Sequence, residues 1–137
     1  MERYSDIIID HYENPRNVGD MAEADALGAA FNPVCGDTML LSLRIQDGRI
    51  TDARFRTEGC VAAVGVSSVV TELIVGRSLA EAREVTREKM AQAAGGLPAS
   101  KIHASVLVAD ALKRALADFE ARGKEEGGRR KGSDPRP

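Results

Sequence analysis

Two cysteines, one aspartate and one histidine are the residues of this chain best suited to bind a metal ion or to act as nucleophiles. Cys35 and Asp37 are separated only by Gly36, so a thiol and a carboxylate can point to the same side of an extended segment. Gly36 also lets the backbone turn between them, because glycine has no Cβ. This spacing predicts that both side chains can approach one ion.

Cys60 and His103 each lie where a loop meets an expected helix. At a helix start, free backbone N–H groups and the helix dipole favour the thiolate, which is the form that binds metals and attacks electrophiles. Each residue also has a purely structural alternative. A lone cysteine is often buried and inert, a lone histidine is often a surface or capping residue, and Asp37 can cap a hairpin. Spacing alone therefore leaves Cys35, Asp37, Cys60 and His103 as a candidate ligand set.

The segments that must position these side chains follow an α+β order. Residues 4–12 predict a short amphipathic helix, which ends at 14–19 because the residue before a proline is pushed out of the helical region. Alternating apolar and polar residues predict strands over 38–45 and 52–58, joined by a tight turn at Asp47 and Gly48. A weaker strand is expected over Ala26–Phe31, followed by a loop that carries Cys35 and Asp37.

A run of helices is predicted after the second strand of this hairpin. Apolar residues recur at helical spacing from 66 to 73 and form a buried stripe, which Gly76 ends. Ser78 and Glu81 have the spacing of a capping box. The four expected helices cover residues 60–75, 79–85, 87–94 and, after a connector over 97–101, roughly 103–120.

The composition describes one domain and excludes several classes of protein. The chain has 137 residues, of which 43% are hydrophobic and only 4% aromatic, so Val, Ile, Leu and Ala must build the core. A net charge of −2 argues against a nucleic-acid binder that neutralises phosphates. The most apolar stretch, 61–75, is too short to span a membrane. Without a signal peptide, a cytoplasmic location is expected, where two cysteines act as ligands or nucleophiles sooner than as a disulfide.

The C-terminal end of the chain differs in charge from the rest. From Ala121 onward it has six Lys or Arg and three Asp or Glu, whereas the preceding residues are acidic overall. Since this end shows no apolar periodicity, the sequence predicts a domain over residues 1–122 and a disordered basic tail over 123–137. We expect the tail to be solvated; contact with an acidic partner is the alternative.

Seven stretches of the sequence match the pattern of a known family. They cover residues 4–5, 10–19, 32–37, 55–60, 67–68, 71–72 and 97–103. Together they resemble the IscU/NifU-type scaffold proteins on which iron–sulfur clusters are assembled, over a region from about Tyr4 to Arg122. The resemblance implies an α+β fold in which a small three-stranded antiparallel sheet is packed by helices. It also implies a scaffold or carrier that binds clusters and is not a turnover enzyme.

The resemblance assigns roles to the four candidate residues. The family builds its cluster site from three cysteines, an aspartate and a histidine; by position these include Cys35, Asp37, Cys60 and His103. The third cysteine directly follows the histidine, where this chain has Ala104. A methyl group cannot accept persulfide sulfur, because the transfer needs a thiolate. The resemblance thus implies a site for a transient two-iron two-sulfur cluster, iron or zinc, with impaired sulfur acceptance.

The resemblance also implies protein partners. The family receives sulfur from a cysteine desulfurase and works with a ferredoxin or a frataxin-like protein. A family segment, Leu-Pro-Pro-Val-Lys, is gripped by an Hsp70-type chaperone that acts with a co-chaperone. Here Leu97, Pro98 and Lys101 match that segment, but the second proline is lost, so chaperone binding is expected to be weakened. The alternative function is a non-catalytic interaction module that docks on the desulfurase or its regulators.

Overall fold

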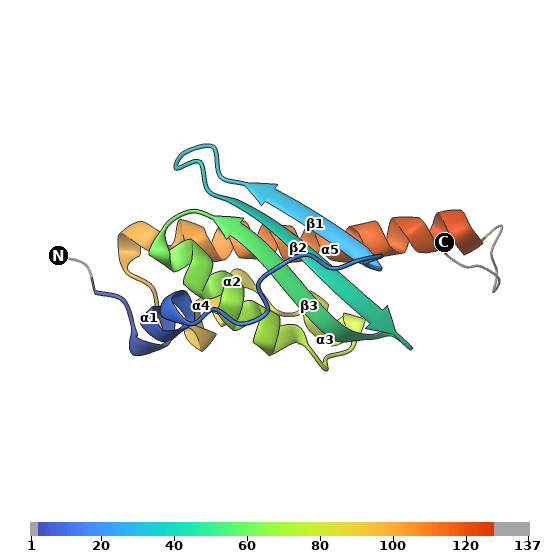
Figure 1. Ribbon diagram of the computed structural model, residues 1–137, viewed down its shortest axis with the longest axis horizontal. Coiled ribbons are helices and arrows are strands. Elements are labelled where there is room, and N and C mark those ends of the chain that lie inside the picture. Colours follow the sequence, from blue (N-terminus) through green and yellow to red (C-terminus); the bar gives the residue numbers. More distant parts are fainter. Residues whose placement is uncertain (1–2, 128–137) are drawn as a thin grey trace.

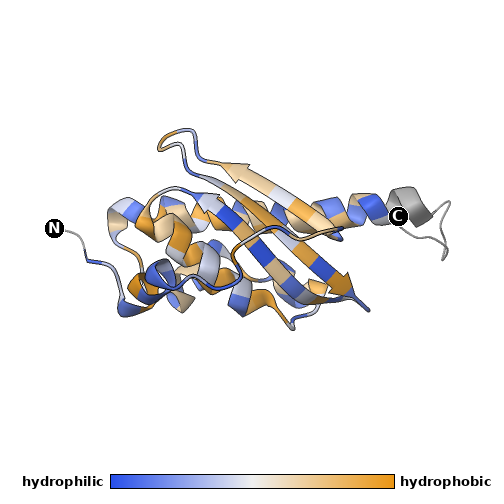
Figure 2. Cartoon of the chain, in the orientation of Figure 1, coloured by the Kyte–Doolittle hydropathy of each residue, from blue (hydrophilic) through white to orange (hydrophobic). Residues whose placement is uncertain are grey.

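Three strands form an antiparallel sheet in the computed structural model, which describes residues 3–127 (Figure 1). They are β1 (Ala26–Phe31), β2 (Thr38–Gln46) and β3 (Arg49–Glu58), in the spatial order β1-β2-β3. The weak strand and both alternating runs that the sequence predicts are therefore confirmed, as is the α+β class with a three-stranded sheet. Along β3, apolar residues alternate with polar ones, so that one face of the strand is buried (Figure 2).

The β2–β3 hairpin has the two-residue turn that its sequence predicts. Asp47 and Gly48 have φ values of 51° and 74°, and a turn with two positive φ values matches the twist of the strands that it joins. The register pairs Leu41 with Phe55, and both side chains are buried. The hairpin therefore sets which residues of both strands face the core.

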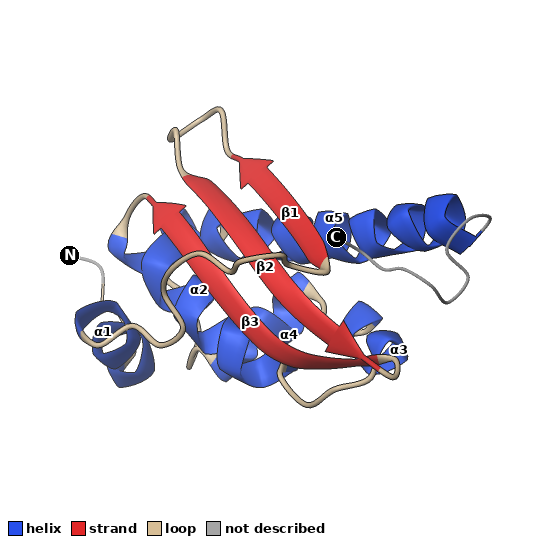
Figure 3. Ribbon diagram, turned by 45° about the vertical axis from the view of Figure 1, so that its right-hand side comes forward, coloured by secondary structure: helices blue, strands red, loops and turns tan. Residues whose placement is uncertain are grey.

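Five α-helices and one 3₁₀ turn are present among residues 3–127. They are α1 (Asp6–Glu13), α2 (Val61–Ile74), α3 (Leu79–Arg83), α4 (Arg87–Ala93), the turn η1 (Ala99–Lys101) and α5 (His103–Gly127). α2 packs on β3, and α5 packs on β1 and β2, so these helices cover one face of the sheet (Figure 3). The capping box that the sequence predicts at Ser78 and Glu81 is present. None of the described helices is long and apolar enough to cross a membrane.

α5 and β1 approach each other at the level of their backbones. A Cβ atom added at Gly28 would lie 2.1 Å from the carbonyl oxygen of Ala111 and 2.4 Å from the backbone nitrogen of Ala115. Both alanines are fully buried. Small residues on both elements thus let the long helix lie directly on the edge strand, which explains how a core poor in aromatic side chains can be close-packed.

α5 is longer than the sequence predicts. It extends to Gly127, seven residues beyond Glu120, so residues 123–127 are helical and not part of an irregular tail. Arg122 contributes to this extension: its Nε atom lies 3.0 Å from Asp118 Oδ2, one helical turn earlier, and its Nη1 atom donates to the carbonyl oxygen of Ala24 at 2.8 Å. The remaining tail, 128–137, lies outside the described residues, so its disorder stays a prediction.

Candidate metal centre

The loop between β1 and β2 carries Cys35 and Asp37. The Asn32 N–H donates to the carbonyl oxygen of Asp37 at 2.9 Å, and the Gly36 N–H donates to that of Asn32 at 2.7 Å. The Asn32 side chain accepts a hydrogen bond from the Val34 N–H at 2.9 Å. Gly36 has a φ of +79°, which is the left-handed conformation that glycine adopts easily. The chain therefore turns at Gly36, as the sequence predicts.

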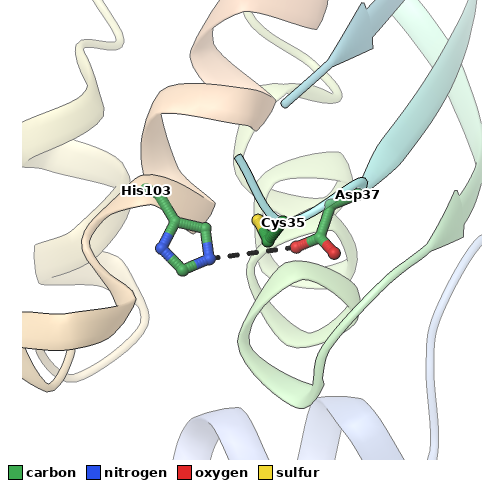
Figure 4. A group of neighbouring side chains, drawn as sticks. All are labelled: Cys35, Asp37 and His103. Carbon is green, nitrogen blue, oxygen red and sulfur yellow. Dashed lines mark ion pairs between the residues drawn. The ribbon is translucent and has the colours of Figure 1, made fainter. Parts of the chain in front are cut away.

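Cys35, Asp37 and His103 converge at one end of the molecule. The ligand atoms of these three side chains all lie within 4.8 Å of one another (Figure 4). His103 is the first residue of α5, and its Nε2 atom lies 3.9 Å from Asp37 Oδ2. Cys35 is exposed, whereas Asp37 is only 5% exposed. A thiol, a carboxylate and an imidazole from two separate parts of the chain thus meet at one point.

Cys60 adjoins this group through the same carboxylate. It is the N-cap residue of α2, and its side chain makes no capping hydrogen bond. Its Sγ atom donates to Asp37 Oδ2 across 3.5 Å. The structure therefore brings together three of the four predicted site residues as a mutual group, and places the fourth in contact with Asp37.

The surroundings of Asp37 are suited to a cation. Among the described residues, the side chains beside its carboxylate are the thiol of Cys60, which is a weak donor, the imidazole of His103, whose nitrogen lies beyond hydrogen-bond distance, and the thiol of Cys35. Buried charges in proteins are paired with an opposite charge or coordinate a metal. Two sulfur atoms, one nitrogen and one oxygen fit tetrahedral zinc, and cysteine and histidine also hold iron–sulfur clusters. The residues present therefore fit either occupant.

Ala104 is fully buried, directly after His103 in α5. Its methyl group belongs to the hydrophobic core of the molecule. This position therefore supplies no donor atom to the neighbouring ligands.

The connector between α4 and α5 contains Leu97, Pro98 and Lys101, all of them half-buried. Leu97 packs against the core, and Pro98 caps the 3₁₀ turn Ala99–Lys101. Part of the connector therefore forms a 3₁₀ turn. The part of these three residues in partner binding stays a prediction.

A polar network between α2 and the N-terminal segment is not predicted from the sequence. Ser68 Oγ lies 2.7 Å from His11 Nδ1 and accepts a hydrogen bond from the Arg16 N–H at 2.8 Å. Asn17 Nδ2 donates to Thr71 Oγ1 at 3.0 Å. These contacts attach α1 and the segment after it to α2. Polar residues within an otherwise apolar helix are the signal that could have revealed the network.

His11 is the titratable member of this network and is 8% exposed. Burial lowers the pKa of His11, the positive charge of Arg16 lowers it further, and the carboxylates of Glu72 and Asp10 oppose these effects. Its Nε2 atom lies 3.8 Å from Glu72 Oε1. The neutral imidazole is thus the form favoured in the folded chain.

Comparison with known proteins gives one family and several close relatives. The model of the NifU-like N terminal domain family matches residues 3–126. The iron-sulfur cluster assembly scaffold protein IscU 1 of Archaeoglobus fulgidus is 49% identical over 116 residues, which are 85% of this chain and 76% of that protein. The scaffold protein IscU of Escherichia coli K12 is 46% identical over 123 residues, which are 87% of this chain and 95% of that protein.

Solved structures have the same fold. The N-terminal NifU-like protein of Brucella abortus superposes with a TM-score of 0.73 at 19% identity, over 86% of this chain and 94% of that one. A SUF-system scaffold protein from Fervidobacterium islandicum gives a TM-score of 0.67 at 21% identity, over 82% of this chain and 96% of that one. At such identities the likeness concerns the fold alone.

Proposed function

The chain belongs to the NifU-like N-terminal domain family, and on that premise we propose that it is an iron–sulfur cluster assembly scaffold. Its cargo is a transient two-iron two-sulfur cluster, with iron or zinc as simpler occupants of the same residues. The relatives named as scaffold proteins, at 44–49% identity, support this proposal. The role is that of a carrier in the cytoplasm, with no turnover chemistry of its own.

One observation carries the proposal: the ligand atoms of Cys35, Asp37 and His103 lie within 4.8 Å of one another, and Cys60 Sγ lies 3.5 Å from the same Asp37 carboxylate. Two thiols supply the soft ligands that iron–sulfur clusters need. The imidazole replaces one cysteine, as histidine does in some two-iron clusters. A carboxylate is a weaker partner for iron than a thiolate, which suits a cargo that must be released.

Sulfur acceptance is the step in which this chain departs from the family. The thiol expected after His103 is replaced by the buried methyl group of Ala104. We propose that loading from a cysteine desulfurase is impaired, and that sulfur enters as sulfide or as a preformed cluster. The other partners that we propose are a ferredoxin or frataxin-like protein and a chaperone of the Hsp70 type with its co-chaperone, which would grip Leu97, Pro98 and Lys101 weakly.

Anaerobic reconstitution with ferric iron and sulfide tests the scaffold function. We expect a visible absorption spectrum of a two-iron two-sulfur cluster, and metal analysis of the aerobically purified chain should find zinc instead. Cys35→Ala and Cys60→Ala should abolish the cluster spectrum, whereas Val34→Ala, at a neighbouring exposed residue, should not. If the unaltered chain gives neither a cluster spectrum nor bound zinc, the scaffold function is wrong.

A second function rests on the buried Ala104. Without a third thiol, the chain can serve as an interaction module that docks on the desulfurase or its regulators and completes no cluster. The two functions differ in the iron content of the unaltered chain after reconstitution, because a docking module binds the desulfurase but carries no iron.

A further inference from the structure

Gly59, the residue before Cys60, lies against the carboxylate of Asp37. A Cβ atom added at Gly59 would lie 2.6 Å from Asp37 Cγ, 2.7 Å from its Oδ1 and 3.0 Å from its Cβ. Non-bonded carbon atoms are at optimal separation at roughly 3.5–4.0 Å. A side chain at position 59 and the carboxylate in its present place therefore exclude each other.

The backbone conformation gives no reason for glycine at this position. Gly36 and Gly48 have φ values of +79° and +74°, and a Cβ atom added at either would meet open space. Gly59 is the opposite case, because its φ lies outside the left-handed region and only the space beside it is restricted. What the missing side chain provides here is room for Asp37.

The end of the β2–β3 ladder and one further hydrogen bond restrain the two backbones near this contact. Thr38 pairs with Glu58 at the end of the β2–β3 ladder, and Asp37 and Gly59 are the next residues along each strand. The backbone of Asp37 is also held by the hydrogen bond from the Asn32 N–H. The carboxylate itself would have to move, by about 1 Å if ordinary contact distances are to be restored. Metal sites tolerate displacements of only about 0.5 Å.

We propose that Gly59 is a positioning residue for Asp37. Its bare Cα keeps the carboxylate next to Cys60 Sγ and His103 Nε2, at 3.5 and 3.9 Å, where it can serve as a ligand. The consequence for metal binding rests on the proposed function. The steric relation between Gly59 and Asp37 is independent of the proposed function.

A double-mutant cycle with cobalt(II) as the probe tests the consequence for binding. We expect Gly59→Ala to lower the affinity for cobalt by about 10- to 100-fold, which is the usual effect of disturbing a group that orients a ligand. In an Asp37→Ala background the same substitution should change the affinity by less than about twofold, since the carboxylate that it displaces is gone. Gly123→Ala is the control, because a Cβ atom there meets no atom within 4 Å.

Urea unfolding of the four proteins of this cycle without metal separates the inference from the scaffold function. The four are the unaltered chain, Gly59→Ala, Asp37→Ala and the double variant. Gly59→Ala should lower the midpoint of urea unfolding in the unaltered background and have a much smaller effect beside Asp37→Ala. If Gly59→Ala alone does not fold, the double variant should fold again. Equal effects in both backgrounds, or a double variant that stays unfolded, would overturn the inference. If the unaltered chain binds no cobalt, the scaffold function is contradicted. The unfolding measurements then still test whether Gly59 positions Asp37.

Discussion

Cys60 Sγ lies 3.5 Å from Asp37 Oδ2, although 23 positions separate the two residues in the sequence. Asp37 directly precedes β2, and Cys60 directly precedes α2, so this contact joins the start of the central strand to the start of a helix that packs on β3. His103 adds the start of α5 to the same place. Three element starts therefore define the candidate site, and each can be tested through its own side chain.

Replacing Cys60 should weaken metal binding without unfolding the chain. Cys60→Ser keeps a small polar residue at the N-cap of α2, where serine is a favoured residue, but removes the thiolate. We expect zinc affinity to fall by at least about tenfold, measured by competition with a chromogenic chelator. Val34→Ala, at a residue that is 93% exposed, is the matched control. Unchanged zinc affinity in Cys60→Ser would exclude Cys60 as a ligand.

Restoring a thiol after His103 should restore sulfur acceptance. Ala104 is fully buried, so the extra sulfur atom of Ala104→Cys is expected to cost about 1–3 kcal/mol of stability through overpacking. With a cysteine desulfurase and L-cysteine, mass spectrometry should detect a persulfide on this variant and far less on the unaltered chain.

Ala104→Ser is the control for this experiment, because it adds a side chain of similar size that cannot form a persulfide. If the unaltered chain takes up sulfur as readily as Ala104→Cys, the proposed impairment is wrong. If Ala104→Cys takes up none, the rest of the site has lost its function, and the docking module becomes the better description.

Most of the fold is predictable from the sequence because its signals are local. The alternation in β2 and β3, the turn at Asp47 and Gly48 and the capping box at Ser78 each depend on residues close together in the chain. The end of α5 is not predictable in this way. Beyond Glu120 the helix carries Arg122, which donates to the carbonyl oxygen of Ala24, and no local pattern indicates a contact between residues so far apart.

The candidate site is likewise predictable only where its signals are local. Residue type and position at loop–helix junctions select Cys35, Asp37, Cys60 and His103, and the family resemblance adds their roles. The space that Gly59 leaves for Asp37 arises only when the β2–β3 register places the two residues side by side. Likewise, the contact between Ser68 and His11 depends on how α1 packs against α2. Neither relation has a signal in the spacing of residues.

Acid should destabilise the folded chain through His11. Because burial lowers the pKa of His11 below 6.5 in the folded chain, the unfolded chain binds a proton more readily. The stability that the neutral imidazole contributes is therefore present above the unfolded pKa and is lost as the pH falls below it. Urea unfolding between pH 7.5 and about 5 should show this loss.

His11→Gln is the matched variant for this prediction, since glutamine can still hydrogen-bond to Ser68 but does not titrate. His103 is unchanged in both proteins, so the comparison isolates the effect of His11. The unaltered chain should lose more stability than His11→Gln over this pH range. Parallel pH profiles for the two proteins would show that His11 is not responsible.

The backbone contact between β1 and α5 predicts the most severe single substitution outside the candidate site. Gly28→Ala places a methyl group 2.1 Å from the carbonyl oxygen of Ala111, and backbone atoms cannot rotate away as a side chain can. The long helix would have to lift off the sheet, and we expect a loss of about 3 kcal/mol or more in the free energy of unfolding. Gly123→Ala, the same substitution in an open part of α5, should be neutral or slightly stabilising, because alanine has the higher helix propensity. Since His103 begins the same helix, Gly28→Ala should also weaken zinc binding from a distance. A Gly28→Ala variant with unchanged stability and unchanged zinc affinity would show that α5 does not pack on β1 in this way.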